Sequence, residues 1–240
     1  MQVVNATSDI VIEDKKSKHN INIILFTVIA ILGLIALDQY FKVYIKTTMQ
    51  LHTETKVLGD WFRLHFTENP GMAFGLELDF LGGYGKLTLT LFRLIAVVFG
   101  FYLLAKQIKR GAHKGFLFCI ALILAGAIGN LIDSIFYGVI FKDINYYVGG
   151  YFHGHVVDML YFPVIQGHYW SWIPKLGGQD FTFFSPVFNL ADAFISTGAI
   201  AIFVFQGVFF PKAKKEELIP DGEDLPDEFI DDGTAGIVQE

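Results

Sequence analysis

The sequence predicts an all-α membrane protein, a bundle of four transmembrane helices with a small β-containing extracytoplasmic loop region. Its composition is the first observation: 53% of the 240 residues are hydrophobic and only 18% are charged, whereas soluble domains carry about a quarter charged residues. The mean hydropathy is +0.47, and the apolar residues gather in long runs flanked by lysines. These features exclude an ordinary soluble enzyme and, for most of the chain, disorder.

Four apolar runs are candidates to cross a bilayer as helices. A hydrocarbon core of about 30 Å needs roughly 20 apolar residues of helix, and helices satisfy their own backbone hydrogen bonds in lipid. The runs comprise residues 21–37 (extendable toward 45), 87–105, 115–132 and 188–210.

Basic residues predict the orientation of these spans. Cytoplasmic loops and flanks are enriched in Lys and Arg. Three short segments are basic, namely those containing Lys15, Lys16 and Lys18, then Lys106, Lys109, Arg110 and Lys114, and finally Lys212, Lys214 and Lys215. We therefore expect both termini in the cytoplasm and the two long loops on the outer side.

The charge and cysteine content narrow the class further. From Pro211 onward there are ten acids and three lysines, so the net charge of −6 belongs to the tail and the rest of the chain carries +1. We expect no nucleic-acid partner. The single cysteine, Cys119, excludes an intrachain disulfide framework. The predicted organisation is a cytoplasmic segment 1–20, a transmembrane domain 21–211 and an acidic, disordered cytoplasmic tail 212–240.

Four carboxylates fall at one predicted membrane level, near the outer face: Asp38, Asp133, Asp158 and Asp192. Helical spacing puts Lys42 on the face of Asp38. It also aligns Gly126, Asn130 and Asp133, and it places Asn189 beside Asp192. Ionisable residues inside membrane spans are costly and are functional candidates. A structural reading stays open for Asp38 with Lys42, and for Asp133 as a bond between helices.

Two carboxylates that share a low-dielectric site hold one proton between them. That is the arrangement of an aspartic protease, in which one carboxylate activates water and the other protonates the carbonyl. The chain contains neither a Gly-x-Ser-x-Gly elbow nor a His-Glu-x-x-His motif.

A metal site is the rival interpretation of one segment. His153, His155 and Asp158 could supply three ligands. Two histidines in a loop rich in aromatic residues are more often surface residues, so we expect no metal and no cofactor.

Five blocks in order resemble those of lipoprotein signal peptidase, or signal peptidase II, a bacterial aspartic membrane protease. The resemblance extends over roughly residues 20–210. The blocks are similar to D-Q-x-x-K, N-x-G-x-A-F, G-A-x-G-N-x-x-D, V-V-D-F and F-N-x-A-D. They fall at residues 38–42, 69–74, 126–133, 156–159 and 188–192.

The resemblance implies a function and a site. The catalytic dyad would be Asp158 and Asp192. The substrate would be a diacylglyceryl-modified prolipoprotein, cut just before its lipidated cysteine, and the inhibitor a globomycin-type cyclic peptide. The enzyme would be a monomer in the bacterial inner membrane and need no cofactor. Supporting residues would be Asp38, Lys42, Asn69, Gly71, Ala73, Phe74, Gly126, Asn130, Asp133, Asn189 and Ala191.

The chain also departs from the family pattern. The third block usually ends Asp-Arg, whereas here Ser134 follows Asp133. Arg93, inside the second span, is a candidate to compensate or to pair with one of the acids. Two alternative functions remain at this stage, a small proton-coupled transporter and a catalytically silent lipoprotein-binding relative. Clustering of the acids at one face argues against a transport path, and the intact dyad argues against a silent relative.

Overall fold

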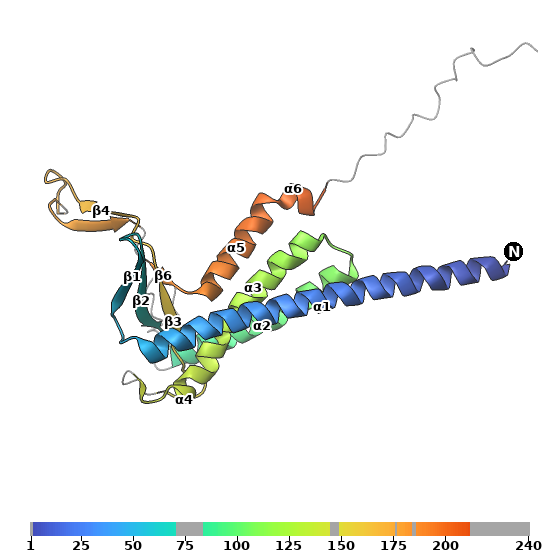
Figure 1. Ribbon diagram of the computed structural model, residues 1–240, viewed down its shortest axis with the longest axis horizontal. Helices are drawn as coiled ribbons and strands as arrows, with labels where there is room; N and C mark the ends of the chain where they lie inside the picture. Colours follow the sequence, from blue (N-terminus) through green and yellow to red (C-terminus); the bar gives the residue numbers. More distant parts are fainter. Residues whose placement is uncertain (1, 71–83, 145–148, 176, 184–185, 212–240) are drawn as a thin grey trace, which may run out of the picture. The chain divides into compact units, whose positions relative to one another are not determined.

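The computed structural model describes residues 2–70, 84–144, 149–175, 177–183 and 186–211. Its main helices run roughly along one direction, with strands gathered at one end (Figure 1). These helices are α1 (Gln2–Thr48), α2 (Gly85–Lys109), α3 (Lys114–Ile132) and α5 (Leu190–Val204). After α3 the chain continues through a π-helical turn, η2 (Asp133–Tyr137), and the short α4 (Gly138–Ile140), while α6 (Gln206–Phe209) follows α5.

Three of the four predicted spans are confirmed as long apolar helices. The segments Asn20–Thr48, Gly85–Lys109 and Lys114–Ile140 are each long and apolar enough to cross a membrane. The fourth, α5, is apolar but has only 15 residues. The first helix begins at Gln2 and continues without a break to Thr48, so it reaches well beyond the predicted 21–37.

The predicted fold class is confirmed only in part, because the β-containing region is a four-stranded sheet and the fold is mixed rather than all-α. Four antiparallel strands pair in the order β1-β2-β3-β6, and a separate hairpin pairs β4 with β5. Two of them, β1 and β2, lie between α1 and α2 in the chain. The strands are β1 (Glu54–Leu58), β2 (Phe62–Asn69), β3 (Val156–Tyr161), β4 (Ile165–His168), β5 (Asp180–Phe183) and β6 (Val187–Phe188).

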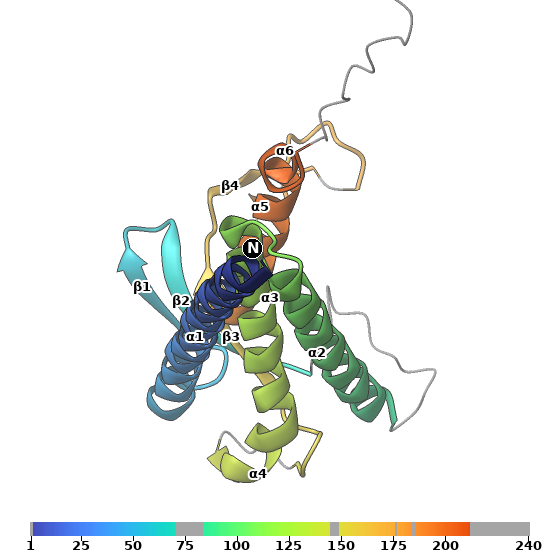
Figure 2. The ribbon, with the colours of Figure 1, turned by 90° about the vertical axis from the view of Figure 1, so that its right-hand side faces the viewer.

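Helix α3 is the centre of the bundle. Half of the residues in the most apolar stretch of Lys114–Ile140 are buried, against 11% in that of Asn20–Thr48. It contacts α1, α2 and α5, and a view along α1 shows α3 between α1 and α2 (Figure 2). Exposed apolar residues cover the outward faces of α1 and α2, as at Phe26 and Phe92. This distribution is the one that lipid, rather than water, would solvate.

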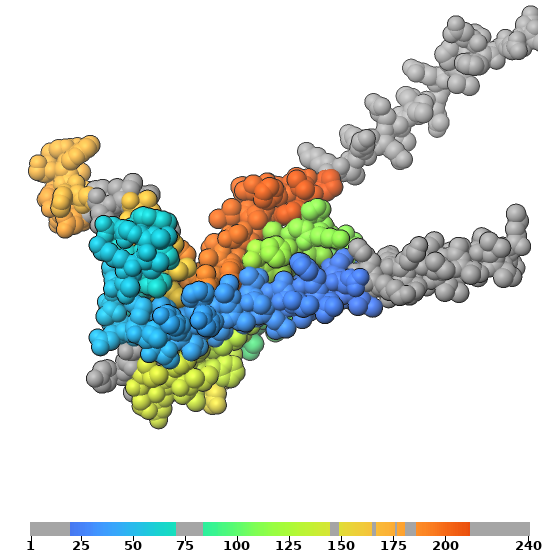
Figure 3. All heavy atoms as spheres, in the orientation of Figure 1, coloured from blue at the N-terminus to red at the C-terminus, as the bar shows by residue number. Residues whose placement is uncertain are grey.

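Small residues let α5 approach α3 closely. A Cβ added to Gly126 would collide with the carbonyl oxygen of Ala191, and one added to Gly198 would lie 2.7 Å from the carbonyl oxygen of Cys119. Close backbone approach through small residues is a common way for helices to pack in lipid, where apolar side chains gain nothing by leaving the solvent. Figure 3 shows α5 and α3 as adjoining bodies.

The sheet has two unlike faces. Phe66, Val157 and Met159 are fully buried in a core with Ile45 of α1 and Tyr137 of η2. Adjacent residues along a strand point to opposite faces, so Thr67, Asn69 and Asp158 face away from this core. The sheet therefore anchors itself to the end of α1 with one face and presents polar groups with the other.

A buried ion pair joins α1 to the sheet. Lys46, in the last turn of α1, bonds Glu68 of β2, and both side chains are at most 6% exposed. His155 Nδ1 lies 3.4 Å from the second carboxylate oxygen of Glu68. Burial makes each partner depend on the other, because an unpaired buried charge is costly.

Replacing Gly126 by Ala should destabilise the bundle by about 1–3 kcal/mol, because the added methyl group overpacks the contact between α3 and α5. The measurement is the thermal unfolding temperature of the purified protein in detergent. Gly33→Ala is the matched control, since a Cβ at Gly33 meets nothing within 4 Å. Equal unfolding temperatures for the two variants would contradict the packing described.

Replacing Glu68 by Gln should cost about 3–5 kcal/mol, because it removes the negative charge that the buried ammonium of Lys46 contacts. The same substitution at Glu54, whose partly exposed carboxylate pairs with Arg63 and His65, should cost about 1 kcal/mol at most. Denaturant unfolding of both variants measures the difference. A Glu68→Gln protein as stable as Glu54→Gln would argue against the buried pair.

Candidate active site

Asp158 lies on β3, on the polar face of the sheet. It is 3% exposed on β3. Each carboxylate oxygen accepts one side-chain amide: Oδ2 from Asn69 Nδ2 at 3.1 Å, and Oδ1 from Asn189 Nδ2 at 2.6 Å. Asn69 reaches it from β2, whose pairing with β3 sets Thr67 opposite Asp158.

Asp192 is held at the N-terminus of α5 by a capping box. Asn189 is the N-cap, and its Oδ1 accepts the backbone N–H of Asp192 at 2.9 Å. In return Asp192 Oδ2 accepts the backbone N–H of Asn189 at 3.4 Å. This reciprocal pattern requires an N-cap residue and an acid three positions later. The Asn-x-x-Asp spacing of the fifth block is therefore explained by helix capping.

Asp38 satisfies another free donor of the same helix end. The first N–H groups of a helix have no partner inside it. Asp38 Oδ1, from α1, accepts the N–H of Ala191 at 2.9 Å, while Oδ2 lies 2.9 Å from Lys42 Nζ. Gly129 leaves room for this carboxylate, because a Cβ there would lie 2.5 Å from Asp38 Oδ2. Asp38 thus fixes α5 to α1 and α3.

Lys42 is the charged centre of the helix contacts. Its side chain is fully buried, and Nζ lies 2.9 Å from Asp38 Oδ2 and 2.8 Å from Asp133 Oδ2. It donates a third bond of 2.9 Å to Asn130 Oδ1. Two carboxylates and one amide oxygen therefore surround the ammonium.

The amides of Asn130 and Asn189 have only one orientation that satisfies all their neighbours. Lys42 can only donate, so Asn130 turns its Oδ1 to Lys42 and donates through Nδ2 to Asp192 Oδ1 at 2.8 Å. Asn189 uses Oδ1 to cap α5, so its Nδ2 faces Asp158. The network itself decides the amide direction. Each aspartate therefore receives a donor whose direction a second contact fixes.

Burial and, after it, the negative charge of nearby Asp192 raise the pKa of Asp158 to about 7, although the amides of Asn69 and Asn189 oppose the shift. Asp158 can therefore hold a proton near neutral pH beside the carboxylate of Asp192. Such a pair can activate a water molecule with one member and donate a proton with the other.

Sequence reasoning missed two groups that complete the site, Gln39 and Tyr137, whereas it had already named Arg93 as a candidate. Gln39 donates to Asp133 Oδ1 at 2.8 Å, and Tyr137 O–H fixes that amide by donating to Gln39 Oε1 at 2.9 Å. The guanidinium of Arg93 donates through Nη1 to Ser134 Oγ at 2.8 Å. Gln39 adjoins Asp38 in the first block, and that adjacency was the available signal.

The remaining predicted residues divide into two groups. Gly126 and Ala191 pack α3 against α5 beneath the polar network. Gly71, Ala73 and Phe74 lie outside the described residues. As for the alternative metal site, His155 faces Glu68, and within the described ranges no three His, Cys, Asp or Glu side chains are grouped as metal ligands.

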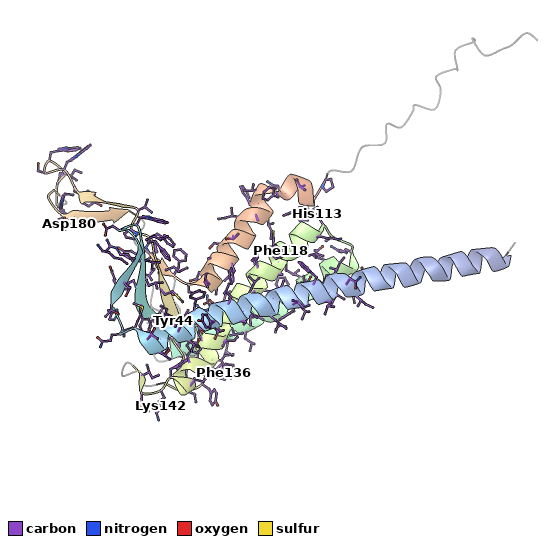
Figure 4. The ribbon with its side chains drawn as sticks, viewed as in Figure 1. Tyr44, His113, Phe118, Phe136, Lys142 and Asp180 are labelled. Atoms are coloured by element: carbon purple, nitrogen blue, oxygen red, sulfur yellow. The ribbon has the colours of Figure 1, made fainter. Side chains whose placement is uncertain are left out.

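The polar network lies toward one end of the bundle. Lys142, just beyond α4, marks the end that carries the sheet, and His113, at the start of α3, marks the opposite end (Figure 4). Asp158 belongs to that sheet, and Asp192 lies in the first turn of α5. A pair of carboxylates held by three asparagine amides next to lipid-facing helices suits acid–base hydrolysis at a membrane boundary.

Comparisons with known proteins agree with this arrangement. The model of the family described as signal peptidase (SPase) II matches residues 29–209. A lipoprotein signal peptidase of Porphyromonas gingivalis is 50% identical over 182 residues, which cover 71% of this chain and 78% of the relative. That of Amoebophilus asiaticus is 41% identical over 180 residues, 72% of this chain and 74% of the relative.

A solved bacterial membrane enzyme shares the fold. The TM-score is 0.52 at 22% identity, and the match covers 80% of this chain and 93% of that one. With the extent of the family match and the identity to these relatives, the chain belongs to the signal peptidase II family.

Proposed function

We propose that Asp158 and Asp192 are the catalytic dyad with which this signal peptidase II removes signal peptides from prolipoproteins. The observation that carries the proposal is the network of three asparagines. Asn69 and Asn189 bond the two oxygens of Asp158, and Asn130 bonds Asp192. These side-chain amide donors hold the carboxylates of Asp158 and Asp192 in fixed positions, although the two negative charges repel each other.

The chemistry follows from a dyad that holds one proton. The ionised carboxylate removes a proton from water as the oxygen attacks the scissile carbonyl, and the protonated carboxyl gives its proton to the carbonyl oxygen. Collapse of the tetrahedral intermediate returns a proton to the departing amine and breaks the C–N bond. Water is the only co-reactant, and the chain supplies every proton-transfer group.

The substrate class within this reaction is a finer proposal. We infer that the enzyme cuts diacylglyceryl-modified prolipoproteins just before the lipidated cysteine, and that a globomycin-type peptide competes for the site. The apolar exposed faces of α1 and α2 keep the enzyme in the same bilayer as the diacylglyceryl chains. Because the dyad lies toward one end of the bundle, it would reach a scissile bond located at the boundary between lipid and water.

The supporting residues belong to the same proposal. Lys42, Asp38 and Asp133 would position α1, α3 and α5, and the three asparagines would orient the dyad. Gly71, Ala73 and Phe74 would contact the substrate. One chain contains the whole network, so a monomer suffices.

Topology and organisation are likewise proposals. The basic flanks support an orientation in which both termini are cytoplasmic and the dyad lies near the outer face of the inner membrane. Residues 21–211 would form the peptidase domain, with 1–20 and 212–240 as cytoplasmic extensions. The position of the sheet, beyond the end of α1 opposite the N-terminus, supports this orientation (Figure 1).

Asp158→Asn and Asp192→Asn should each abolish cleavage. Each variant keeps only one carboxyl group, which cannot act as the acid and the base at once. The assay is cleavage of a diacylglyceryl-modified prolipoprotein by the purified protein in detergent, with EDTA in a parallel reaction. Asp143→Asn is the matched control, since Asp143 is exposed beyond α4, and it should retain wild-type activity. Cleavage by either dyad variant would refute the dyad, and loss of cleavage in EDTA would indicate a metal.

Activity should fall as the pH rises above about 7, because the pKa of Asp158 is about 7 and an acid that has lost its proton cannot donate it. The measurement is kcat/KM against pH. Asn69→Ala removes a donor that favours the carboxylate, which raises the pKa of Asp158, so its alkaline limb should lie at higher pH. A limb that is unchanged in this variant, or one that moves to lower pH, would contradict the assignment.

A further inference from the structure

Arg93 is an unusual residue for its helix. Its neighbours on α2, Phe92, Leu94 and Ile95, are exposed apolar side chains on a membrane-crossing segment, whereas Arg93 is partly buried. A charge at such a depth is costly and faces protein or a polar cavity. Its position therefore needs an explanation in terms of the groups it meets.

Ser134 receives the guanidinium. Nη1 of Arg93 lies 2.8 Å from Ser134 Oγ, and the hydroxyl donates onward to the carbonyl oxygen of Asn130 at 2.9 Å. Ser134 is fully buried in the π-helical turn that follows α3, and such turns are frequent at functional sites. The contact fixes one end of a long cation beside Asn130, whose amide bonds Asp192.

The charge of Arg93 acts on the acids of the site. It interacts electrostatically with Asp192, Asp133 and Asp158. Lys42 is already engaged by Asp38 and Asp133. A dyad that shares one proton adds another negative charge, and the guanidinium of Arg93 offsets it from the side of α2.

We propose that Arg93, seated on Ser134, is a positioning residue that stabilises the singly ionised dyad. This inference rests on the dyad of the proposed function. It also accounts for Ser134 where the family block usually has arginine: the guanidinium reaches that place from α2 instead of from the residue after Asp133.

Arg93→Met keeps much of the volume and removes the charge. We expect kcat to fall by about tenfold to a hundredfold, while KM changes little. This is less than the roughly hundredfold to thousandfold loss on removing a donor that contacts the reacting atoms, because Arg93 acts from a distance. The alkaline limb should move to higher pH, because the pKa of Asp158 rises when a nearby positive charge is removed. Arg110→Met, at the exposed C-terminal end of α2, is the matched control and should behave as the wild type.

Moving the arginine gives the decisive test. In Arg93→Met/Ser134→Arg the arginine is attached at position 134, the residue that the guanidinium of Arg93 contacts in the wild type. The kcat of this double variant should be at least tenfold higher than that of Arg93→Met, and its pH profile should return toward that of the wild type. A merely structural role of Arg93 would not be rescued from another helix.

Two other variants keep the proposal testable if Arg93→Met does not fold, as judged by its unfolding temperature. Ser134→Ala removes the anchor and should lower kcat with a smaller shift of the same sign in the alkaline limb. Arg93→Lys keeps the positive charge. It should be more active than the double variant Arg93→Lys/Ser134→Ala, which also lacks the hydroxyl that anchors the cation. An alkaline limb that does not shift in a folded Arg93→Met or Ser134→Ala protein would overturn the proposal. A defect confined to KM would also overturn it, as would a failure of Ser134→Arg to restore the activity of Arg93→Met.

Failure of this inference and failure of the proposed function give different results. If wild-type cleavage requires Asp158 but Arg93→Met matches the wild type, only the role of Arg93 is lost. If wild-type cleavage does not require Asp158, the dyad itself is wrong.

Discussion

The buried ammonium of Lys42 is the interaction on which the site depends. Removing an ammonium from water costs several kcal/mol even after relaxation, and Lys42 meets that cost with three acceptors, the carboxylates of Asp38 and Asp133 and the amide oxygen of Asn130. These contacts join α1 to α3. They also determine which end of the Asn130 amide faces Asp192. A single cation therefore packs two helices together and orients a donor toward one acid of the proposed dyad.

The N-terminus of α5 is the second constraint. A helix end buried among other helices must find partners for its free N–H groups, and here Asn189 and Asp38 supply them. The same contacts place Asp192 and direct the amide of Asn189 toward Asp158. Helix capping and the positioning of the dyad are thus one set of hydrogen bonds, so a change that weakens the cap also disturbs the acids.

The sequence predicted the parts of this structure that depend on local pattern. Apolar runs located the long helices, and helical spacing grouped Asn130 with Asp133 and Asn189 with Asp192. It did not predict the strand that carries Asp158, because 156–161 is a short, mostly apolar run whose pairing partner, β2, lies almost 90 residues earlier. Nor did it establish the bond between Arg93 and Ser134, or that between Lys46 and Glu68. Contacts between distant segments leave no periodicity in either one.

The two acids of the proposed dyad come from different kinds of scaffold. Asp158 is fixed by strand pairing to a sheet whose other face packs on the end of α1, and Asp192 is fixed by capping to a helix that packs on α3 through glycines. The two acids are not neighbours along the chain, since β4 and β5 lie between them, so the chain itself does not determine the distance between their carboxyl groups. The hydrogen bond from Asn189, on α5, to Asp158, on β3, sets it directly. The geometry of the dyad therefore depends on how firmly the sheet is held to the bundle, and so on contacts such as Lys46 with Glu68 that lie away from the reacting groups.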